Sequence, residues 1–184
     1  GRALVAAQLL MNDDYPSWLY QVKLGATTMW ERWDGWTPEK GFSDVGMNSF
    51  NHYAFGSVGD YMYRHIAGIA PLTPGYSRVR VEPTLTAGLD HAEASYDSIA
   101  GTIKSSWKRT SGGVEYAITV PTNTTAEIRL KVEPGMRITE GGRELETSRG
   151  LTSIERTDPG FVRMNAESGT YIFAVTNPPL DPSR

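Results

Sequence analysis

The sequence predicts an α+β protein in two parts, a set of helices followed by an antiparallel β-sandwich of the jelly-roll type. In the first part, apolar residues recur at steps of three and four residues, which is typical of helices. After Pro71, Pro74 and Gly75 the period changes to two, and short strand-like segments follow at close intervals. The expected parts are a helical region over residues 1–72, a sandwich over residues 73–178 and a tail over residues 179–184.

The helical part is expected to contain three helices joined by loops. The first spans about residues 2–12 and lacks a capping residue before its first apolar position, so we expect the chain to begin within a helix. The second spans about residues 17–24, and the third spans about residues 48–69, between the capping residue Ser49 and the stop at Gly68. Three helices are too few to enclose a pocket. We therefore expect them to be the last helices of a larger helical structure whose earlier part is missing.

Nine strands are expected in the second part. The clearest is Thr125–Val132, where apolar residues alternate with polar ones, so that one face is buried and the other is exposed. The glycine pairs at 112–113 and 141–142 lie between expected strands and predict hairpin turns. The nine expected strands span residues 78–82, 91–97, 101–109, 114–120, 125–132, 137–140, 152–155, 161–164 and 171–176.

Composition excludes several classes of function. The 18 basic and 21 acidic residues give a net charge of −3 without a basic cluster, so nucleic acid is not an expected partner. A membrane-spanning segment is not expected, because no run of 18 apolar residues occurs. The absence of cysteine excludes disulfides and thiolate chemistry. His52, His65 and His91 lack metal-ligand spacing, so no metal site is expected.

The segment from Gly25 to Trp36 carries the clearest chemical signal. It places Glu31 between Trp30 and Trp33, with Trp36 nearby. Sugar rings pack their C–H faces against indole, and a carboxylate supplies proton transfer and hydrogen bonds to hydroxyl groups, so the mixture indicates a sugar site. The structural alternative is a tryptophan-rich loop that closes the end of a domain, in which Glu31 and Arg32 form a solvated ion pair.

Two ordered motifs carry a resemblance to a known family. Gly-Ala-Thr-Thr-Met-Trp-Glu-Arg-Trp-Asp at 25–34 and Ser-Phe-Asn-His-Tyr-Ala-Phe-Gly-Ser-Val-Gly-Asp-Tyr-Met-Tyr at 49–63 resemble the end of the catalytic domain of inverting bacterial α-L-rhamnosidases. The resemblance continues through residues 67–69, 94–96, 101–107 and 120–126 and so covers most of the chain. It implies the last helices of an (α/α)6 barrel followed by a C-terminal β-sandwich, and a substrate that is a rhamnose-containing glycoside or polysaccharide.

The resemblance also implies roles for individual residues. Glu31 corresponds to the general base that activates water, and His52 to a histidine that contacts the rhamnose hydroxyls. Trp33 is expected to bind substrate as well, although tryptophans are more often core residues and we expect packing roles for at least two of Trp30, Trp33 and Trp36. His52 stands near an expected helix start, where it could instead cap or pack. Asn48 and Asn51 are expected to be helix caps.

One element of the family's chemistry is missing from the sequence. An inverting glycosidase needs a second carboxyl group as general acid. In the family this acid comes from an acidic motif well upstream, and no such motif precedes Gly25. Asp13 and Asp14 resemble a helix-ending turn instead. We therefore expect the chain alone to be inactive, and ordinary inverting hydrolysis needs no cofactor.

Two other functions remain open at this stage. The chain could belong to a barrel glycosidase for another sugar, because most residues that select the sugar lie outside it. It could also be a non-catalytic carbohydrate-binding or structural module. In that case Trp107 and Tyr96 on the expected strands would be candidate sugar platforms, although core or cross-strand packing is their expected role.

Overall fold

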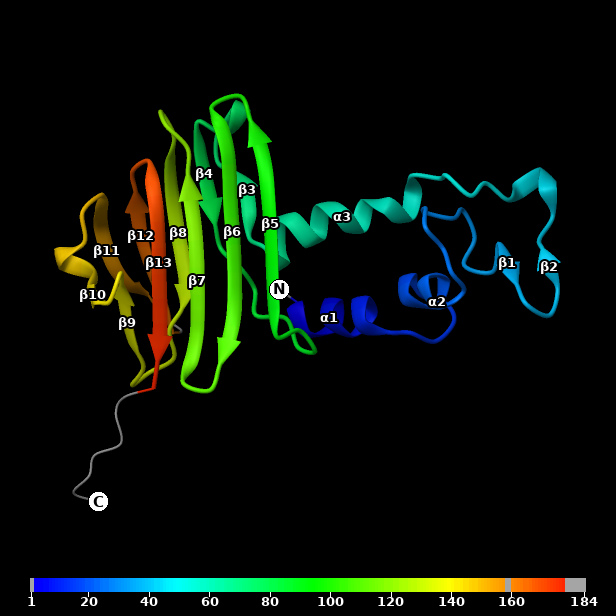
Figure 1. The fold of residues 1–184 in the computed structure, drawn as a ribbon, viewed down its shortest axis with the longest axis horizontal. Helices are drawn as coiled ribbons and strands as arrows, with labels where there is room; N and C mark the ends of the chain where they lie inside the picture. The colour runs from blue at the N-terminus through cyan, green and yellow to red at the C-terminus, as the bar shows by residue number, and fades with distance from the viewer. Residues whose placement is uncertain (1, 158–159, 178–184) are drawn as a thin grey trace, which may run out of the picture. The chain divides into compact units, whose positions relative to one another are not determined.

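A computed structural model describes residues 2–157 and 160–177 of the chain. The chain divides into two compact units (Figure 1). The first extends to Tyr61 and includes Thr86–Gly88, and the second runs from Met62 to Leu85 and resumes at Leu89. The units thus separate before Met62, whereas the boundary expected from the sequence near residue 72 stays a prediction.

The first unit contains short helices joined by long loops. Helices α1 (Ala3–Met11) and α2 (Trp18–Lys23) confirm the first two predicted helices. The hydroxyl of Ser17 accepts a hydrogen bond from the Tyr20 N–H at 3.0 Å and so caps α2. The remaining elements are the strands β1 (Trp36–Thr37) and β2 (Gly41–Phe42), the 3₁₀ turns η1 (Val45–Met47) and η2 (Ala54–Ser57), and the helix α3 (Val58–Tyr61).

The single long helix expected over residues 48–69 is wrong in its first part. Residues 48–53 are not helical, and the helical conformation begins only at Ala54. The Ser49 and His52 backbone groups bond to an earlier loop, described below, and are therefore not available to a helix. The second unit then begins with a π-helical turn, η3 (Met62–Ile66), in which the Ala67 N–H donates to the Met62 carbonyl at 2.9 Å.

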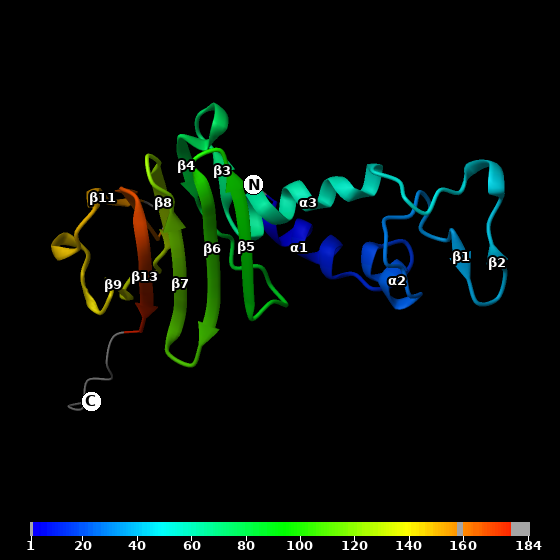
Figure 2. The same ribbon diagram turned by 45° about the horizontal axis from the view of Figure 1, so that its top comes forward.

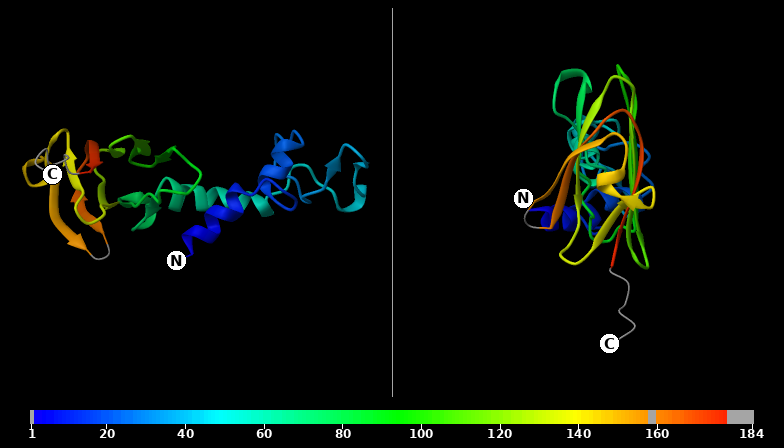
Figure 3. Two further views of the ribbon diagram at one scale, coloured as in Figure 1. Left: turned by 90° about the horizontal axis from the view of Figure 1, so that it is seen from below. Right: turned by 90° about the vertical axis from the view of Figure 1, so that its left-hand side faces the viewer.

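The second unit is a β-sandwich. In its described part, residues 62–157 and 160–177, a six-stranded sheet has the order β10-β9-β13-β7-β6-β5 and a five-stranded sheet the order β11-β12-β8-β4-β3. Figure 2 shows the six-stranded sheet from a second angle, and the right-hand view of Figure 3 shows the two layers from the side. The strands are β3 (Ile69–Pro71), β4 (Arg78–Val81), β5 (His91–Ser98), β6 (Gly101–Thr110), β7 (Gly113–Val120), β8 (Thr125–Lys131), β9 (Arg137–Glu140), β10 (Arg143–Glu144), β11 (Leu151–Thr157), β12 (Phe161–Ala166) and β13 (Gly169–Thr176).

All nine predicted strands are confirmed, within one or two residues at their ends. The sequence analysis missed the short strands β3 and β10 and the hairpin β1–β2. One pairing differs from the antiparallel expectation, because β4 and β8 run parallel, with Val79 opposite Ala126. The other described pairs of the two large sheets are antiparallel.

The sandwich core holds the segment that precedes β3. Trp107 is only 1% exposed, and its indole N–H donates to the Ile66 carbonyl at 2.9 Å. The Ser105 hydroxyl donates to the Ala67 carbonyl at 2.6 Å. At Gly68, with φ at +82°, a Cβ atom would lie 2.3 Å from the Glu82 backbone, so only glycine fits. These contacts explain why the second unit begins ahead of the proline-rich segment. They also confirm core packing for Trp107 and exclude its ring as a sugar platform.

The Trp107 hydrogen bond yields a stability prediction. We expect Trp107→Phe to lower the free energy of unfolding by about 1–3 kcal/mol, because the buried Ile66 carbonyl loses its donor. Urea denaturation followed by circular dichroism measures this difference. Ile172→Ala, at a side chain that is 50% exposed, is the control and should change stability by less than about 0.5 kcal/mol. Equal effects of the two substitutions would contradict the prediction.

A second prediction concerns Tyr116, whose buried hydroxyl has no hydrogen-bond partner among the described residues. Burial raises the pKa of Tyr116 to about 12, and the Arg109 charge offsets this only partly. The unfolded chain, with its ordinary tyrosine pKa near 10, releases the proton first, so this group's contribution to stability is lost as the pH rises from about 10 to 12. Tyr116→Phe should therefore flatten the fall in stability between pH 9 and 11.5 and cost little at pH 7. Denaturation midpoints that fall in parallel for both proteins would contradict this.

Candidate functional site

Two loop segments of the first unit are joined by backbone hydrogen bonds. The Glu31 N–H donates to the Ser49 carbonyl at 2.8 Å, and the His52 N–H donates to the Met29 carbonyl at 2.8 Å. The Thr28 hydroxyl also donates to the Phe50 carbonyl. The two residues singled out from the sequence thus lie on neighbouring segments of one pairing, although 21 positions separate them.

The Glu31 carboxylate is held by a neutral donor. Its Oε2 accepts the Ser49 N–H at 2.8 Å, and the Ser49 carbonyl accepts the Glu31 N–H. The Ser49 backbone therefore binds both the side chain and the backbone of Glu31. The Glu31–Arg32 ion pair of the structural alternative does not form, because the Arg32 Nε pairs with the Asp34 Oδ1 at 3.3 Å. Among the described residues, no cation pairs with Glu31. A half-buried carboxylate that is oriented in this way, without a counter-charge, can accept a proton from water.

His52 has one ring nitrogen engaged. Its Nδ1 accepts the N–H of Ala54, the first residue of the turn η2, at 3.3 Å, although the N-cap residue of that turn is Tyr53. An accepting Nδ1 places the proton of the neutral ring on Nε2. The half-buried ring therefore has an Nε2–H group that this hydrogen bond does not use and that could donate to a sugar hydroxyl.

Two of the tryptophans take part in aromatic packing, as the sequence analysis expected. Trp30 is 6% exposed and meets Phe50 edge to face at 5.2 Å between ring centroids. Trp33 stacks on Phe55 at 3.7 Å, and Trp18 meets Trp33 edge to face at 5.4 Å. These contacts fix the loop that carries Glu31. A contact between Trp33 and substrate stays a prediction.

Side chains that the sequence analysis did not assign to the site also brace this loop. Gln21, 2% exposed, donates from its amide to the Arg32 carbonyl at 2.8 Å. Asn48 donates to the Gly35 carbonyl at 2.8 Å, so the helix-cap role expected for Asn48 is wrong. Gln21, a polar residue between Tyr20 and Val22 in α2, was the signal in the sequence that could have indicated a buried brace.

The described residues contain neither a membrane-spanning helix nor a cluster of metal-binding side chains. No described helix has the length and apolar character needed to cross a membrane. Within residues 2–157 and 160–177, no three histidine or acidic side chains are grouped in a way that could hold a metal ion.

Comparison with known families gives a consistent result. Residues 1–66 match the bacterial α-L-rhamnosidase six-hairpin glycosidase domain, and residues 68–144 match the bacterial α-L-rhamnosidase C-terminal domain. The chain belongs to the bacterial α-L-rhamnosidase family. Its first unit thus matches the end of the rhamnosidase barrel, and its second the C-terminal β-sandwich.

Individual relatives agree with this assignment. An α-L-rhamnosidase of Streptomyces avermitilis is 40% identical over 175 residues, which are 95% of the chain and 15% of that protein. One from Formosa agariphila is 37% identical over 166 residues, which are 90% of the chain and 18% of that protein. The chain therefore spans less than a fifth of the length of these rhamnosidases.

Solved structures share the fold. A crystal structure of the Streptomyces avermitilis α-L-rhamnosidase complexed with L-rhamnose superposes with a TM-score of 0.80 and 38% identity, over 94% of this chain and 16% of that one. The structure of α-L-rhamnosidase from Dictyoglumus thermophilum gives a TM-score of 0.81 at 30% identity, over 95% of this chain and 19% of that one.

The Asn48 brace predicts local coupling within this rhamnosidase segment. We expect Asn48→Ala to speed hydrogen exchange at the Glu31 and His52 amides by about fivefold, because losing one hydrogen bond costs about 1 kcal/mol. A Cβ atom at Gly35 would lie 2.7 Å from the Asn48 Oδ1, so Gly35→Ala should also loosen the pairing.

In the double variant, Asn48→Ala removes the atom with which the new methyl group collides. The two effects on hydrogen exchange should therefore sum to less than additivity predicts. Additive effects, or unchanged exchange in Asn48→Ala, would contradict this coupling.

Proposed function

We propose that the protein containing this chain is an inverting α-L-rhamnosidase that removes terminal α-L-rhamnose from a glycoside or polysaccharide. Membership of the rhamnosidase family supports the reaction class. The 38% identical Streptomyces structure complexed with L-rhamnose supports the sugar.

Glu31 is the proposed general base. The observation that carries this role is a carboxylate fixed by the Ser49 N–H and paired with no cation among the described residues. In inverting hydrolysis the base takes a proton from water as the oxygen attacks the anomeric carbon, and an acid protonates the leaving oxygen from the opposite face. A carboxylate paired with a cation would be a weaker base, because the cation favours the ionised form.

His52 and Trp33 are the proposed substrate-binding residues. The unused Nε2–H of His52 suits a sugar hydroxyl as a hydrogen-bond acceptor. Trp33 lies two positions after Glu31, and its stacking on Phe55 gives the indole a fixed orientation. An indole held in this way loses little conformational freedom when a sugar packs against it.

The general acid is proposed to come from a part of the protein outside this chain. A proton donor needs a raised pKa, which burial or a neighbouring negative charge provides. Lys23 instead lowers the pKa of Asp13, Arg32 pairs with Asp34, and Asp44 accepts the Gly46 N–H at 2.9 Å. The Lys23 charge therefore favours the ionised form of Asp13, while Asp34 and Asp44 are engaged by other groups. We expect the chain by itself to hydrolyse no rhamnoside.

The alternatives from the sequence analysis have less support. A carbohydrate-binding module that uses an aromatic platform loses Trp107, whose ring is buried in the sandwich. A barrel glycosidase for another sugar remains the closest competing proposal, and comparing cleavage of aryl α-L-rhamnoside with that of other aryl glycosides separates the two.

Glu31→Gln tests the base role in a full-length α-L-rhamnosidase carrying this segment. We expect kcat on an aryl α-L-rhamnoside to fall by about 10²–10⁴ with little change in KM, because the amide cannot accept the proton. The control is Glu39→Gln at an exposed loop position between β1 and β2, which should keep full activity. Nuclear magnetic resonance of the first-formed product should show β-L-rhamnose. Activity retained within about tenfold would rule out the base role, and first-formed α-L-rhamnose would rule out inversion.

A further inference from the structure

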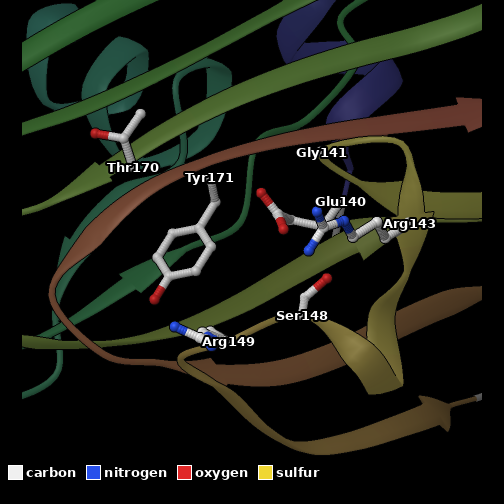
Figure 4. A pocket seen from close by; sticks show the side chains of 7 residues that line it. All are labelled: Glu140, Gly141, Arg143, Ser148, Arg149, Thr170 and Tyr171. Carbon is white, nitrogen blue, oxygen red and sulfur yellow. The ribbon is translucent and has the colours of Figure 1, made fainter.

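A polar pocket lies at one edge of the β-sandwich, within the second unit. Its volume is about 280 Å³, and Figure 4 shows that its lining side chains come from the β9–β10 hairpin, the segment before β11 and the start of β13. Three separated stretches of sequence thus meet only in the fold. The lining residues are Glu140, Gly141, Arg143, Ser148, Arg149, Thr170 and Tyr171.

The base of this pocket is rigid. Tyr171 is 4% exposed, and its hydroxyl donates to the Glu167 carbonyl at 2.9 Å. Gly150 lies against the ring, since a Cβ atom there would come 2.5 Å from the tyrosine oxygen. Ser148, 9% exposed, is held by a hydrogen bond from its N–H to the Leu145 carbonyl at 3.0 Å. Tyr171 and Ser148 therefore form a fixed part of the pocket, beside the exposed side chains of Arg143, Arg149 and Thr170.

The charges of the pocket are unbalanced. The side chains of Arg143 and Arg149 form no ion pair or hydrogen bond with any described residue, although the Arg137 side chain on the same hairpin pairs with Glu144. Glu140 is the one carboxylate among the lining residues, so two guanidinium groups face one negative charge. A guanidinium group binds a carboxylate through two parallel hydrogen bonds, and neither arginine has such a partner within the described chain.

The other polar groups of the pocket indicate which further groups the ligand carries. The Ser148 hydroxyl donates to the Glu144 carbonyl at 3.3 Å, and the Thr170 hydroxyl shares a hydrogen bond with the Thr119 hydroxyl at 3.3 Å, so each keeps capacity to accept from a ligand. The Glu140 Oε1 accepts the Ile172 N–H at 3.4 Å, which leaves Oε2 as an acceptor oxygen. This set matches a small molecule that has several hydroxyl groups besides its negative charge. The volume lies just below the roughly 300–1,000 Å³ of drug-sized sites and suits about one sugar ring.

We propose that this pocket binds a uronic-acid sugar unit, with Arg143 and Arg149 on its carboxylate and Glu140, Ser148 and Thr170 on its hydroxyl groups. The site is independent of the proposed catalysis, because its residues all belong to the sandwich and none lies in the Glu31 loop. It would give the sandwich a ligand-binding role that the buried Trp107 does not provide.

Calorimetric titration of the 184-residue chain tests the site. We expect saturable binding of D-glucuronate or D-galacturonate, and binding of D-glucose and D-galactose at least tenfold weaker, because the neutral sugars leave both guanidinium groups unpaired. Inorganic phosphate is titrated as a simple anion. Equal binding of acidic and neutral sugars, phosphate binding as tight as uronate binding, or no binding of either uronate would overturn the proposal.

Matched variants assign any binding to the pocket. Arg143→Gln and Arg149→Gln should each weaken uronate binding at least tenfold without lowering the thermal midpoint, because neither side chain forms a hydrogen bond or ion pair with a described residue. Arg156→Gln removes the same charge from an exposed position of β11 outside the pocket and should leave binding unchanged. Equal losses in all three variants would indicate nonspecific anion attraction, and no loss in either pocket variant would place the ligand elsewhere.

Discussion

The pairing of the Glu31 and Ser49 segments determines the arrangement of the first unit. That unit has few residues in regular helices and strands, so hydrogen bonds between loops take over the role that a helix or sheet ladder has elsewhere. Ser49 accepts from the backbone of Glu31 and donates to its side chain, which makes the orientation of the carboxylate part of the fold itself. Loss of this pairing would therefore displace the loop and the proposed base together, which is why residues such as Gln21 and Asn48 that brace it belong to the site.

Two buried carbonyl groups anchor the N-terminal end of the sandwich to its core. Those of Ile66 and Ala67 accept from Trp107 and Ser105 inside the core, and the absence of a side chain at Gly68 lets the chain pass against the Glu82 backbone. The proline-rich segment at 71–75 begins at the last residue of β3, within the second unit, and the expected boundary near residue 72 stays a prediction. Composition marks a change in local conformation, whereas the division into units depends on which side chains from distant strands reach the backbone.

The sequence analysis was accurate where local interactions determine the structure, and it failed where residues distant in the sequence determine it. The strands over Gly101–Thr110 and Thr125–Lys131 were predictable because alternation of apolar residues is a local property. The parallel pairing of β4 with β8 was not, since it depends on contacts across more than 40 positions. The helix expected from residue 48 failed for a related reason. Its apolar periodicity is real, but residues 49 and 52 satisfy their backbone groups with residues 29 and 31, and local pattern cannot reveal such a partner.

The candidate site was predictable as a set of residues but not as an electrostatic arrangement. The motif around Glu31 named the carboxylate and the histidine, yet the neighbouring Arg32 suggested an ion pair that Asp34 takes instead. That difference bears directly on the proposed mechanism. Asp13 and Asp34 each pair with a cation, whereas Glu31 accepts an amide N–H that orients it and pairs with no cation among the described residues. Of these three carboxylates, Glu31 combines a fixed geometry with an uncompensated charge, which is the combination that removing a proton from water requires.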